Sequence, residues 1–272
     1  MKLGICSIQR DRGPWIREWI AFHYMMGFKK FYIYLHRCTD NSIEEVIKLK
    51  KTFDIECFQL GADIFRPQLI AYQHAYINYG HVVDWLAFID GDEFIHPTEA
   101  DNIVEVIQSF QYEKISSLAI WWKCFGSSGH INEPNGLILE NYTKRPPLDF
   151  PDNKHFKSVV RGFQGDRFSV LNNSHYFQTI LGTKDESLRV VESGFVPNLN
   201  PSYKKIAINH YVCQSLEYFK NFKQNSGAAD AGAESVRPDT WWTKHDVNEV
   251  EDLDIQRFLP KLKSVLKEIS YD

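Results

Sequence analysis

The sequence predicts an α/β fold with a mainly parallel central sheet flanked by helices. Strand-like and helix-like segments alternate over residues 1–90, so that each of three predicted helices stands between two of four predicted strands. This alternation indicates repeated right-handed βαβ units, whose strands lie parallel in one sheet that is covered on both faces. The 272 residues suffice for one large domain, and 43% hydrophobic against 24% charged residues is the balance of an ordinary globular protein.

Each element of this alternation has its own signal. A strand is predicted where an apolar or alternating run is short, and a helix where apolar residues recur at helical spacing. Pro14 near the start of the first helix and Gly80 at the end of the third match the usual helix boundaries. The predicted order is strand 3–8, helix 13–28, strand 30–35, helix 42–53, strand 54–60, helix 67–80 and strand 84–90.

The second half of the chain has a looser pattern. Segments rich in Gly, Pro, Asn and Ser predict loops, and short strands without strong helices are expected between residues 155 and 211. We find no internal repeat. The predicted order is helix 98–110, strand 115–122, loops 123–136 and 141–154, helix 214–224, a mobile segment 225–240, and a terminal helical region 246–269 broken near Pro260.

Charge and cysteine content narrow the class of protein. The net charge of −4, from 31 basic and 35 acidic residues, argues against a general nucleic-acid binder. Five cysteines without a CxxC pair predict reduced thiols and a cytoplasmic location. Since no run of about 18 apolar residues occurs, no transmembrane segment is expected, and peripheral association with a membrane stays open.

The segment "DWLAFIDGDEFIHP" (84–97) carries the strongest chemical signal. Asp90, Asp92 and Glu93 follow directly on the fourth predicted strand. Carboxylates are costly to bury unless they are paired or bind a cation, so they either face water at a turn or hold a positive group. Ligands of parallel sheets bind beyond the carboxyl ends of the strands, which favours the second reading. Two carboxylates bracketing a glycine suit a hard cation, Mg²⁺ or Mn²⁺.

With these segments in place, the chain resembles glycosyltransferase family 92 and related bacterial GT-A fold glycosyltransferases of the family 2 type. The matching segments occur in the family's order and cover most of the chain: "QRDRGPWIREWIAFHYMMGFKKFYIYLH", "DWLAFIDGDEFIHP", "WWKCFGSSGH", "HFKSVV", "NHYVCQSLEYFKNFK" and "HDVNEVED". The resemblance implies a GT-A-type, Rossmann-like nucleotide-diphospho-sugar transferase. It would form a single catalytic domain over 1–272, with a nucleotide-binding half (1–110), a loop-rich acceptor-side half (111–245) and a helical tail (246–272).

The resemblance also implies an activity. A sugar would pass from a nucleoside-diphosphate donor, UDP-linked, to a glycan or another hydroxyl acceptor, with Mn²⁺ or Mg²⁺ on the donor diphosphate and inversion at the anomeric carbon. Asp90 and Asp92 match the DxD motif that holds this metal. His210 in "NHY" matches a late histidine that serves as a further ligand, although a histidine there is otherwise a core residue. Asp40 matches the acidic position that contacts uridine or its ribose; its alternative is a helix cap.

The group that activates the acceptor is less clear, because "FGSSGHINEP" contains no Asp. The nearest candidates are Glu133 and His130, with Asp152 and Asp246 as alternatives from elsewhere in the chain. A base must reach the attacking hydroxyl before its pKa matters, and the sequence does not establish that reach. Glu93 is either a group that supports the DxD carboxylates or a plain surface acid.

Basic side chains are expected to balance the departing diphosphate. Lys157 and Lys220 rank first, Lys157 because it lies in "HFKSVV" and Lys220 because it follows His210 on a helix; the other candidates are Arg10, Arg12, Arg161 and Lys223. Among the tryptophans, Trp241 and Trp242 in a polar loop are the better candidates for stacking on an acceptor sugar. Trp121 and Trp122 are expected in the core.

Three other functions compete with this one. A phosphatase of the haloacid dehalogenase type also uses DxD, but after the first strand, whereas here the motif follows the fourth. A catalytically inactive sugar- or protein-binding module on the same fold stays open as the main alternative. A nucleic-acid binder using its aromatic residues is disfavoured by the acidic balance of the chain.

Overall fold

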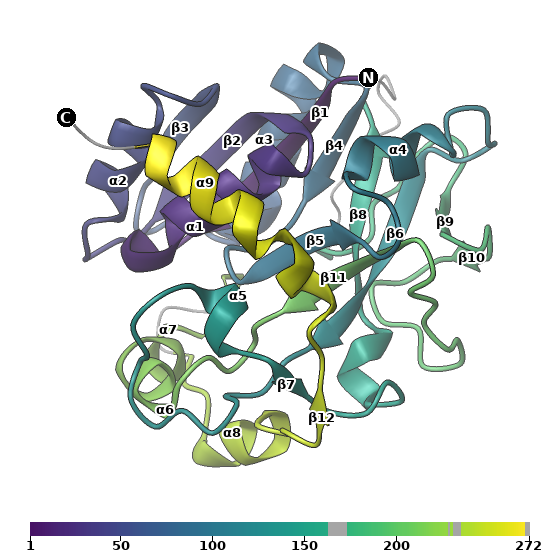
Figure 1. Cartoon of the computed structure of the whole chain (residues 1–272). Helices are drawn as coiled ribbons and strands as arrows, with labels where there is room; N and C mark the ends of the chain where they lie inside the picture. Colours follow the sequence, from purple (N-terminus) through teal and green to yellow (C-terminus); the bar gives the residue numbers. More distant parts are fainter. Residues whose placement is uncertain (163–172, 228, 231–234, 270–272) are drawn as a thin grey trace.

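The computed structural model describes residues 1–162, 173–227, 229–230 and 235–269. Within these ranges the strands form a ten-stranded sheet with the order β10-β9-β6-β8-β4-β1-β2-β3, and β11 joins β6 to β5 at its side (Figure 1). A separate two-stranded sheet pairs β12 with β7. The predicted α/β class is confirmed.

The N-terminal half has the predicted alternation. β1 pairs in parallel with β2 and β4, and β2 pairs in parallel with β3, as the βαβ pattern requires. The elements are β1 Leu3–Gln9, α1 Gly13–Met25, β2 Phe28–His36, α2 Ser42–Leu49, β3 Ile55–Leu60, α3 Pro67–Tyr79, β4 Trp85–Phe88, β5 Glu93–Pro97 and α4 Ile103–Gln108.

Helices cover both faces of this parallel half. Successive side chains of a strand point to opposite faces, so Ile5 packs in one core with residues of α1 and α2, whereas Cys6 packs in another with residues of α3. Because both faces of β1 are covered, the whole strand is buried. The sheet therefore leaves the ends of its strands as the places where a ligand can reach it.

The C-terminal half is mixed in direction. β8 lies antiparallel between β4 and β6, while β11 is parallel to β6 and antiparallel to β5. The prediction of a mainly parallel sheet therefore holds for β3-β2-β1-β4 and is too broad for the rest. The elements are β6 Ser117–Cys124, α5 Ile138–Asn141, β7 Lys144–Arg145, β8 Phe156–Arg161, β9 Thr183–Asp185, β10 Val190–Val191, β11 Ile206–His210, α6 Leu216–Tyr218, α7 Gln224–Ser226, α8 Asp239–His245, β12 Val250–Glu251 and α9 Leu259–Glu268.

The mobility expected for segment 225–240 stays a prediction: residues 228 and 231–234 lie outside the described residues, α7 ends at Ser226 and α8 begins at Asp239. Two other predictions for the last part of the chain are corrected. The terminal helical region contains β12 before a 3-10 helix at Asp254–Phe258. Pro260 does not break a helix: it occupies the first turn of α9, where a missing N–H costs nothing. Figure 1 shows the yellow α9 lying across the purple α1. Arg17 of α1 ties the two together by donating to the backbone oxygens of Leu266 and Ile269.

Across the described residues, no helix combines the length and the apolar character that a membrane crossing needs.

Candidate active site

A cavity of about 650 Å³ opens at the carboxyl ends of the central strands. Gln9 at the end of β1, His36 at the end of β2, the Asp90–Asp92 turn after β4 and His210 at the end of β11 all line it. This is the edge at which the sequence placed the acidic motif. α8 contributes Trp241, Lys244 and His245 to the lining, and Ser226 at the end of α7 and Gly227 after it also line the cavity.

The turn from β4 to β5 presents the two DxD carboxylates. The turn is closed by the backbone N–H of Glu93, which donates to the backbone oxygen of Asp90, and by the N–H of Asp90, which donates to the Glu93 carboxylate at 2.9 Å. Gly91 packs closely here, because a Cβ at this position would lie 3.0 Å from the Gln9 side chain, which would have to shift. The buried strand and the close packing of Gly91 therefore fix where Asp90 and Asp92 point.

Asp90 is held by three side chains. Its Oδ1 accepts from Gln68 Nε2 at 2.6 Å and from the Tyr72 hydroxyl at 3.2 Å, and its Oδ2 accepts from Lys157 Nζ at 2.8 Å. Burial alone would lower the pKa of Lys157, but Asp90 and Glu93 raise it overall, so this buried amine stays charged. Gln68 and Tyr72 belong to α3 and were not recognised from the sequence, where they look like ordinary helix residues.

Glu93 is not a surface acid. It is fully buried, and one of its oxygens lies 3.8 Å from Lys157 Nζ. Burial raises the pKa of Glu93 well above its ordinary value, with Lys157 opposing and Asp90 adding to the rise. Its other oxygen accepts the N–H of Asp90, so Glu93 supports the turn that carries the motif. This decides between the two readings that the sequence left open.

Asp92 and His210 lie next to each other in the cavity lining. Asp92 Oδ1 lies 3.6 Å from His210 Nε2, and Asp92 Oδ2 accepts from Lys223 Nζ at 2.7 Å. Burial alone would raise the pKa of Asp92, but Lys223 and His210 lower it well below the ordinary value. Burial lowers the pKa of His210 despite the nearby carboxylate, so its imidazole is neutral at neutral pH. The structure thus brings these two predicted residues together.

The donor atoms of Asp92 and His210 fit a divalent cation. A carboxylate and a neutral imidazole are both ligands of Mn²⁺ and Mg²⁺, and ligands at about 2.1 Å from such an ion lie about 3 Å apart. Their separation of 3.6 Å is close to that value. Asp90, by contrast, already carries three hydrogen bonds, so its share in the same ion stays a prediction.

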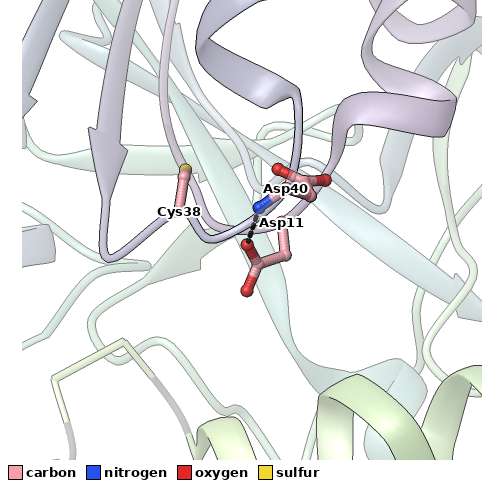
Figure 2. A group of neighbouring side chains, drawn as sticks. All are labelled: Asp11, Cys38 and Asp40. Atoms are coloured by element: carbon pink, nitrogen blue, oxygen red, sulfur yellow. Dashed lines mark hydrogen bonds between the residues drawn. The ribbon is translucent and has the colours of Figure 1, made fainter.

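A second acidic group lies on the loops after β1 and β2. The ligand atoms of Asp11, Cys38 and Asp40 lie within 4.8 Å of one another (Figure 2). Both carboxylates are occupied: Asp11 Oδ1 accepts from the N–H of Thr39 at 2.6 Å, and Asp40 Oδ2 accepts from the N–H of Gly13 at 2.8 Å. Burial raises the pKa of Cys38, which keeps it a thiol and a poor ligand. The hydrogen bonds of this group therefore connect the loop after β1 with the loop after β2.

Asp40 therefore behaves as a cap. Its Oδ2 accepts the N–H of Gly13 at the start of α1. Its Oδ1 accepts the N–H of Ser42 at the start of α2, at 2.9 Å. Asp40 is not among the described residues that line the cavity. The expected contact of Asp40 with uridine stays a prediction, and the geometry supports the alternative reading.

Three sequence candidates, Glu133, His130 and Lys220, lie outside the described cavity lining. Glu133 accepts from the Tyr142 and Ser215 hydroxyls at 2.9 and 2.6 Å, and His130 Nε2 donates to the backbone oxygen of Asn141 at 3.0 Å. Lys220 pairs with Asp239 at 2.5 Å on an exposed surface. These residues hold loops and helices in place, and nothing in their geometry supports the catalytic and donor-binding roles predicted for them.

Other residues enter the site without a strong sequence signal. Trp122 belongs to the hydrophobic core, as expected, and in addition lines the cavity. The rings of His155 and His210 pack against it at centroid distances of 5.0 and 4.2 Å. Asp152, which the sequence offered as an alternative base, lines the cavity too and pairs with His245. Asp246 does not share this position: it accepts the N–H of Ser127 at 2.7 Å.

Arg12 is a buried cation with spare donors. It is 4% exposed, and its Nη1 donates to Gln214 Oε1 at 2.5 Å and to the Tyr218 hydroxyl at 3.0 Å. Its Nε and Nη2 are buried and have no hydrogen-bond partner among the described residues, although Arg12 lines the cavity. Gln9 Oε1 and His210 Nδ1 also line the cavity and are buried, and neither has a partner in the described part of the chain. Such orphaned groups are expected where a polar ligand binds.

The family profile and the similar proteins all point to the same family. The profile of glycosyltransferase family 92 matches residues 2–243. A glycosyltransferase family 92 protein of Oryza sativa subsp. japonica is 26% identical, covering 87% of this chain and 41% of the relative. A family 92 protein of Ricinus communis is 24% identical, covering 97% of this chain and 49% of the relative. One of Arabidopsis thaliana is 24% identical, covering 88% of this chain and 43% of the relative. The chain thus spans less than half the length of these relatives.

Solved structures overlap with part of the fold. Staphylococcus aureus TarS in complex with UDP has a TM-score of 0.38 and 15% identity, covering 60% of this chain and 47% of that one. Glucosyl-3-phosphoglycerate synthase from Mycobacterium tuberculosis, solved with Mn²⁺ and UDP, has a TM-score of 0.33 and 10% identity, covering 45% and 44%. TM-scores of this size describe a partial similarity of folds and carry no conclusion about ligands.

Proposed function

Because the chain belongs to glycosyltransferase family 92, we propose that it transfers a sugar from a nucleoside-diphosphate donor, UDP-linked, to a hydroxyl group of a glycan or another acceptor. The observation that carries this proposal is the Asp92–His210 pair, 3.6 Å apart in a cavity at the carboxyl edge of the sheet. This is where a GT-A-type fold is expected to hold its donor. The cytoplasmic location stays a prediction from the sequence.

Metal dependence is part of the proposal. Asp92 and His210, with Asp90 beside them, would hold Mn²⁺ or Mg²⁺. Such an ion, when bound, neutralises negative charge on a departing diphosphate. Lys157 and Lys223 keep the motif carboxylates in place through contacts of 2.8 and 2.7 Å.

The charge of the cavity supports an anionic donor. Among the described residues that line it are six Lys or Arg, namely Arg10, Arg12, Arg37, Lys223, Arg237 and Lys244. They face three Asp, namely Asp90, Asp92 and Asp152, although the chain as a whole carries a net charge of −4. The excess of cations at this one place favours a polyanionic ligand such as a nucleoside diphosphate. Arg12 offers two nitrogens for it, Nε and Nη2, that have no hydrogen-bond partner within the described ranges.

The reaction that fits this site is a single displacement with inversion. The donor diphosphate would lie against the cationic wall, and the acceptor hydroxyl would approach the anomeric carbon from the side of α8 and Trp122. Preorganised positive charge at the leaving group stabilises the transition state because it needs no rearrangement during the reaction. An inactive sugar- or protein-binding module is the second candidate, and turnover separates it from an enzyme.

Calorimetry with UDP in the presence and absence of Mn²⁺ tests the donor site. We expect binding that depends on the metal, and slow release of free UDP when UDP-glucose, UDP-galactose and UDP-N-acetylglucosamine are offered as donors. Metal-dependent binding without any hydrolysis or transfer would favour the binding module. A folded protein that binds neither UDP nor UDP with Mn²⁺ would contradict the proposal as a whole.

A further inference from the structure

Asp152 is a carboxylate of the cavity wall that the donor site does not use. It lies in the 3-10 helix Pro151–Lys154, and its side chain is 17% exposed. Asp152 Oδ2 is 2.8 Å from His245 Nε2 and 3.2 Å from Lys244 Nζ, both of α8. Among the described lining residues, the other carboxylates are Asp90 and Asp92, which belong to the proposed metal and donor site.

His245 is held so that it must donate to Asp152. Its Nδ1 donates to the backbone oxygen of Trp241 at 2.6 Å, and its Nε2 faces the Asp152 carboxylate. A carbonyl oxygen and an ionised carboxylate are both acceptors, so both ring nitrogens point at acceptors and the orientation of the ring is fixed. The ring also stacks on Trp241 at 4.0 Å. His245 therefore fixes one oxygen of Asp152.

The backbone around Asp152 is equally fixed. The next residue, Asn153, is fully buried, and its Oδ1 accepts the N–H of Cys124 at the end of β6 at 2.8 Å. The backbone oxygen of Asp152 accepts from His155 Nδ1 at 3.0 Å. A carboxylate anchored on both sides meets the requirement that a catalytic group be held by its supporting residues.

Trp122 relates Asp152 to the proposed donor site. His155 is hydrogen-bonded to the backbone oxygen of Asp152, and its ring stacks on Trp122 at a centroid distance of 5.0 Å. The His210 ring packs on the same Trp122 at a centroid distance of 4.2 Å. Asp152 and His210 thus belong to one cavity and are connected through one indole ring. A donor held at His210 and an acceptor near Asp152 would meet above this ring.

From this geometry we propose that Asp152 is the general base of the sugar transfer and that His245 is its positioning residue. The inference rests on the proposed function. A lone pair of the acceptor oxygen forms the new bond to the anomeric carbon, and the bond from that carbon to the diphosphate oxygen breaks with its electron pair on UDP. The hydroxyl proton passes to a carboxylate oxygen of Asp152 and from there to solvent.

The charged surroundings of Asp152 keep its carboxylate ionised and at the same time make it a weak base. Burial alone would raise its pKa, but His245 and Lys244 lower the pKa of Asp152 to about 2. The carboxylate is therefore ionised at any working pH and ready to accept a proton. A base this weak accepts the proton late, when the bond to carbon has already made the hydroxyl acidic. The titratable and charged groups facing it are His245 and Lys244 of α8 and His155 before β8.

Competition between water and azide tests the assignment. Water must lose a proton as it attacks the donor, whereas azide is already an anion and needs no base. In the wild-type protein with Mn²⁺ and the best of the three UDP-sugars, we measure the rate of hydrolysis and the rate of glycosyl azide formation. Their ratio does not depend on the fraction of folded enzyme, so a partly unstable variant still gives a readable result.

Asp152→Asn is expected to lower the ratio of hydrolysis to azide transfer by about 100-fold or more, the usual share of a general base. The donor KM should stay within about threefold, because Asn still accepts from His245. His245→Gln is expected to lower the ratio by about 10-fold, since Gln donates to Asp152 without holding it as rigidly. Asp246→Asn is the matched control. The Asp246 carboxylate accepts the N–H of Ser127, and the ratio of hydrolysis to azide transfer in this variant should equal that of the wild type.

An unchanged ratio in Asp152→Asn, or equal losses of both reactions, would overturn the base assignment and leave the proposed function intact. If Asp152→Asn fails to fold, an unchanged ratio in His245→Gln overturns it instead. A wild-type protein that binds UDP with Mn²⁺ but turns over no donor would overturn the enzymatic function, and the base with it.

Discussion

Asp92 Oδ1 and His210 Nε2 lie 3.6 Å apart although β6, β8 and most loops of the acceptor-side half separate them in the chain. The sheet explains the contact. β11 lies between β5 and β6, and its register sets His210 opposite Glu93, the residue after Asp92. A strand that enters the sheet late in the chain thereby completes a site begun by the fourth strand.

Replacing Asp92 tests the metal site. Asp92→Asn keeps the size of the side chain but removes the charge, so we expect UDP to bind at least 100-fold more weakly in the presence of Mn²⁺, with little change in its absence. Calorimetry measures both affinities, and circular dichroism checks the fold. The exposed Asp101→Asn is the control and should bind like the wild type. Retained metal-dependent affinity in Asp92→Asn would rule out a metal role for this carboxylate.

Arg12 is expected to recognise the diphosphate. Arg12→Met removes the buried nitrogens Nε and Nη2, which have no partner among the residues that the structure describes, and a hydrogen bond to a charged group contributes about 1.5 to 3 kcal/mol. We expect UDP to bind about 10- to 100-fold more weakly and uridine, which lacks phosphate, to bind unchanged. The ratio of the two affinities, measured by calorimetry, separates a lost phosphate contact from a general disturbance of the cavity. Equal weakening of UDP and uridine would argue for a purely structural arginine.

Lys157 and Lys220 should differ in their contribution to stability. Lys157 is 1% exposed, and Lys157→Met would leave Asp90 and the buried Glu93 without their cation. Removing one partner of a fully buried ion pair typically costs about 3 to 5 kcal/mol. Because the Asp90 side chain is 31% exposed, we expect a smaller loss in the free energy of unfolding, about 1 to 3 kcal/mol. Lys220→Met breaks an exposed pair and serves as the matched control, with no measurable change. Chemical denaturation compares the two, and equal stabilities would contradict the buried role of Lys157.

Glu18 is expected to make stability depend on pH. Burial raises its pKa to about 7 from an ordinary value of about 4.5, although the N–H groups of Ile138 and Leu139 and the charge of Arg12 oppose the rise. The folded state therefore holds a proton that the unfolded state releases between these two values. Stability contributed by this group is present below about pH 4.5 and is lost as pH rises through about 7, by up to about 3 kcal/mol.

Glu18→Gln carries no titrating proton, so its unfolding free energy should fall less steeply over this range. Urea denaturation at pH 5, 6 and 7 measures the slope, and the exposed Glu44→Gln is the control. A slope in Glu18→Gln equal to that of the wild type would show that Glu18 does not titrate in this range.

The base candidates show the limit of prediction from the sequence. Glu133 and His130 lie in the loop where the resemblance predicts a base, but their side chains bind Tyr142, Ser215 and the backbone of Asn141. Asp152 is brought to the cavity by a 3-10 helix, and its partner His245 comes from a helix that the composition of its segment did not predict. Loops of low periodicity carry no signal for which side chains meet.

The sequence by itself determined the parallel half of the sheet and the place of Asp90 and Asp92 on its ligand edge. Both follow from local patterns: the period of apolar residues decides strand or helix, and a charged turn after a buried strand must lie at the strand's end. The tertiary structure alone decided that His210 meets Asp92, that Asp40 caps two helices and that Asp152 faces the cavity. Strand direction and register depend on pairing between distant segments, and no local pattern encodes which distant partner a side chain will find.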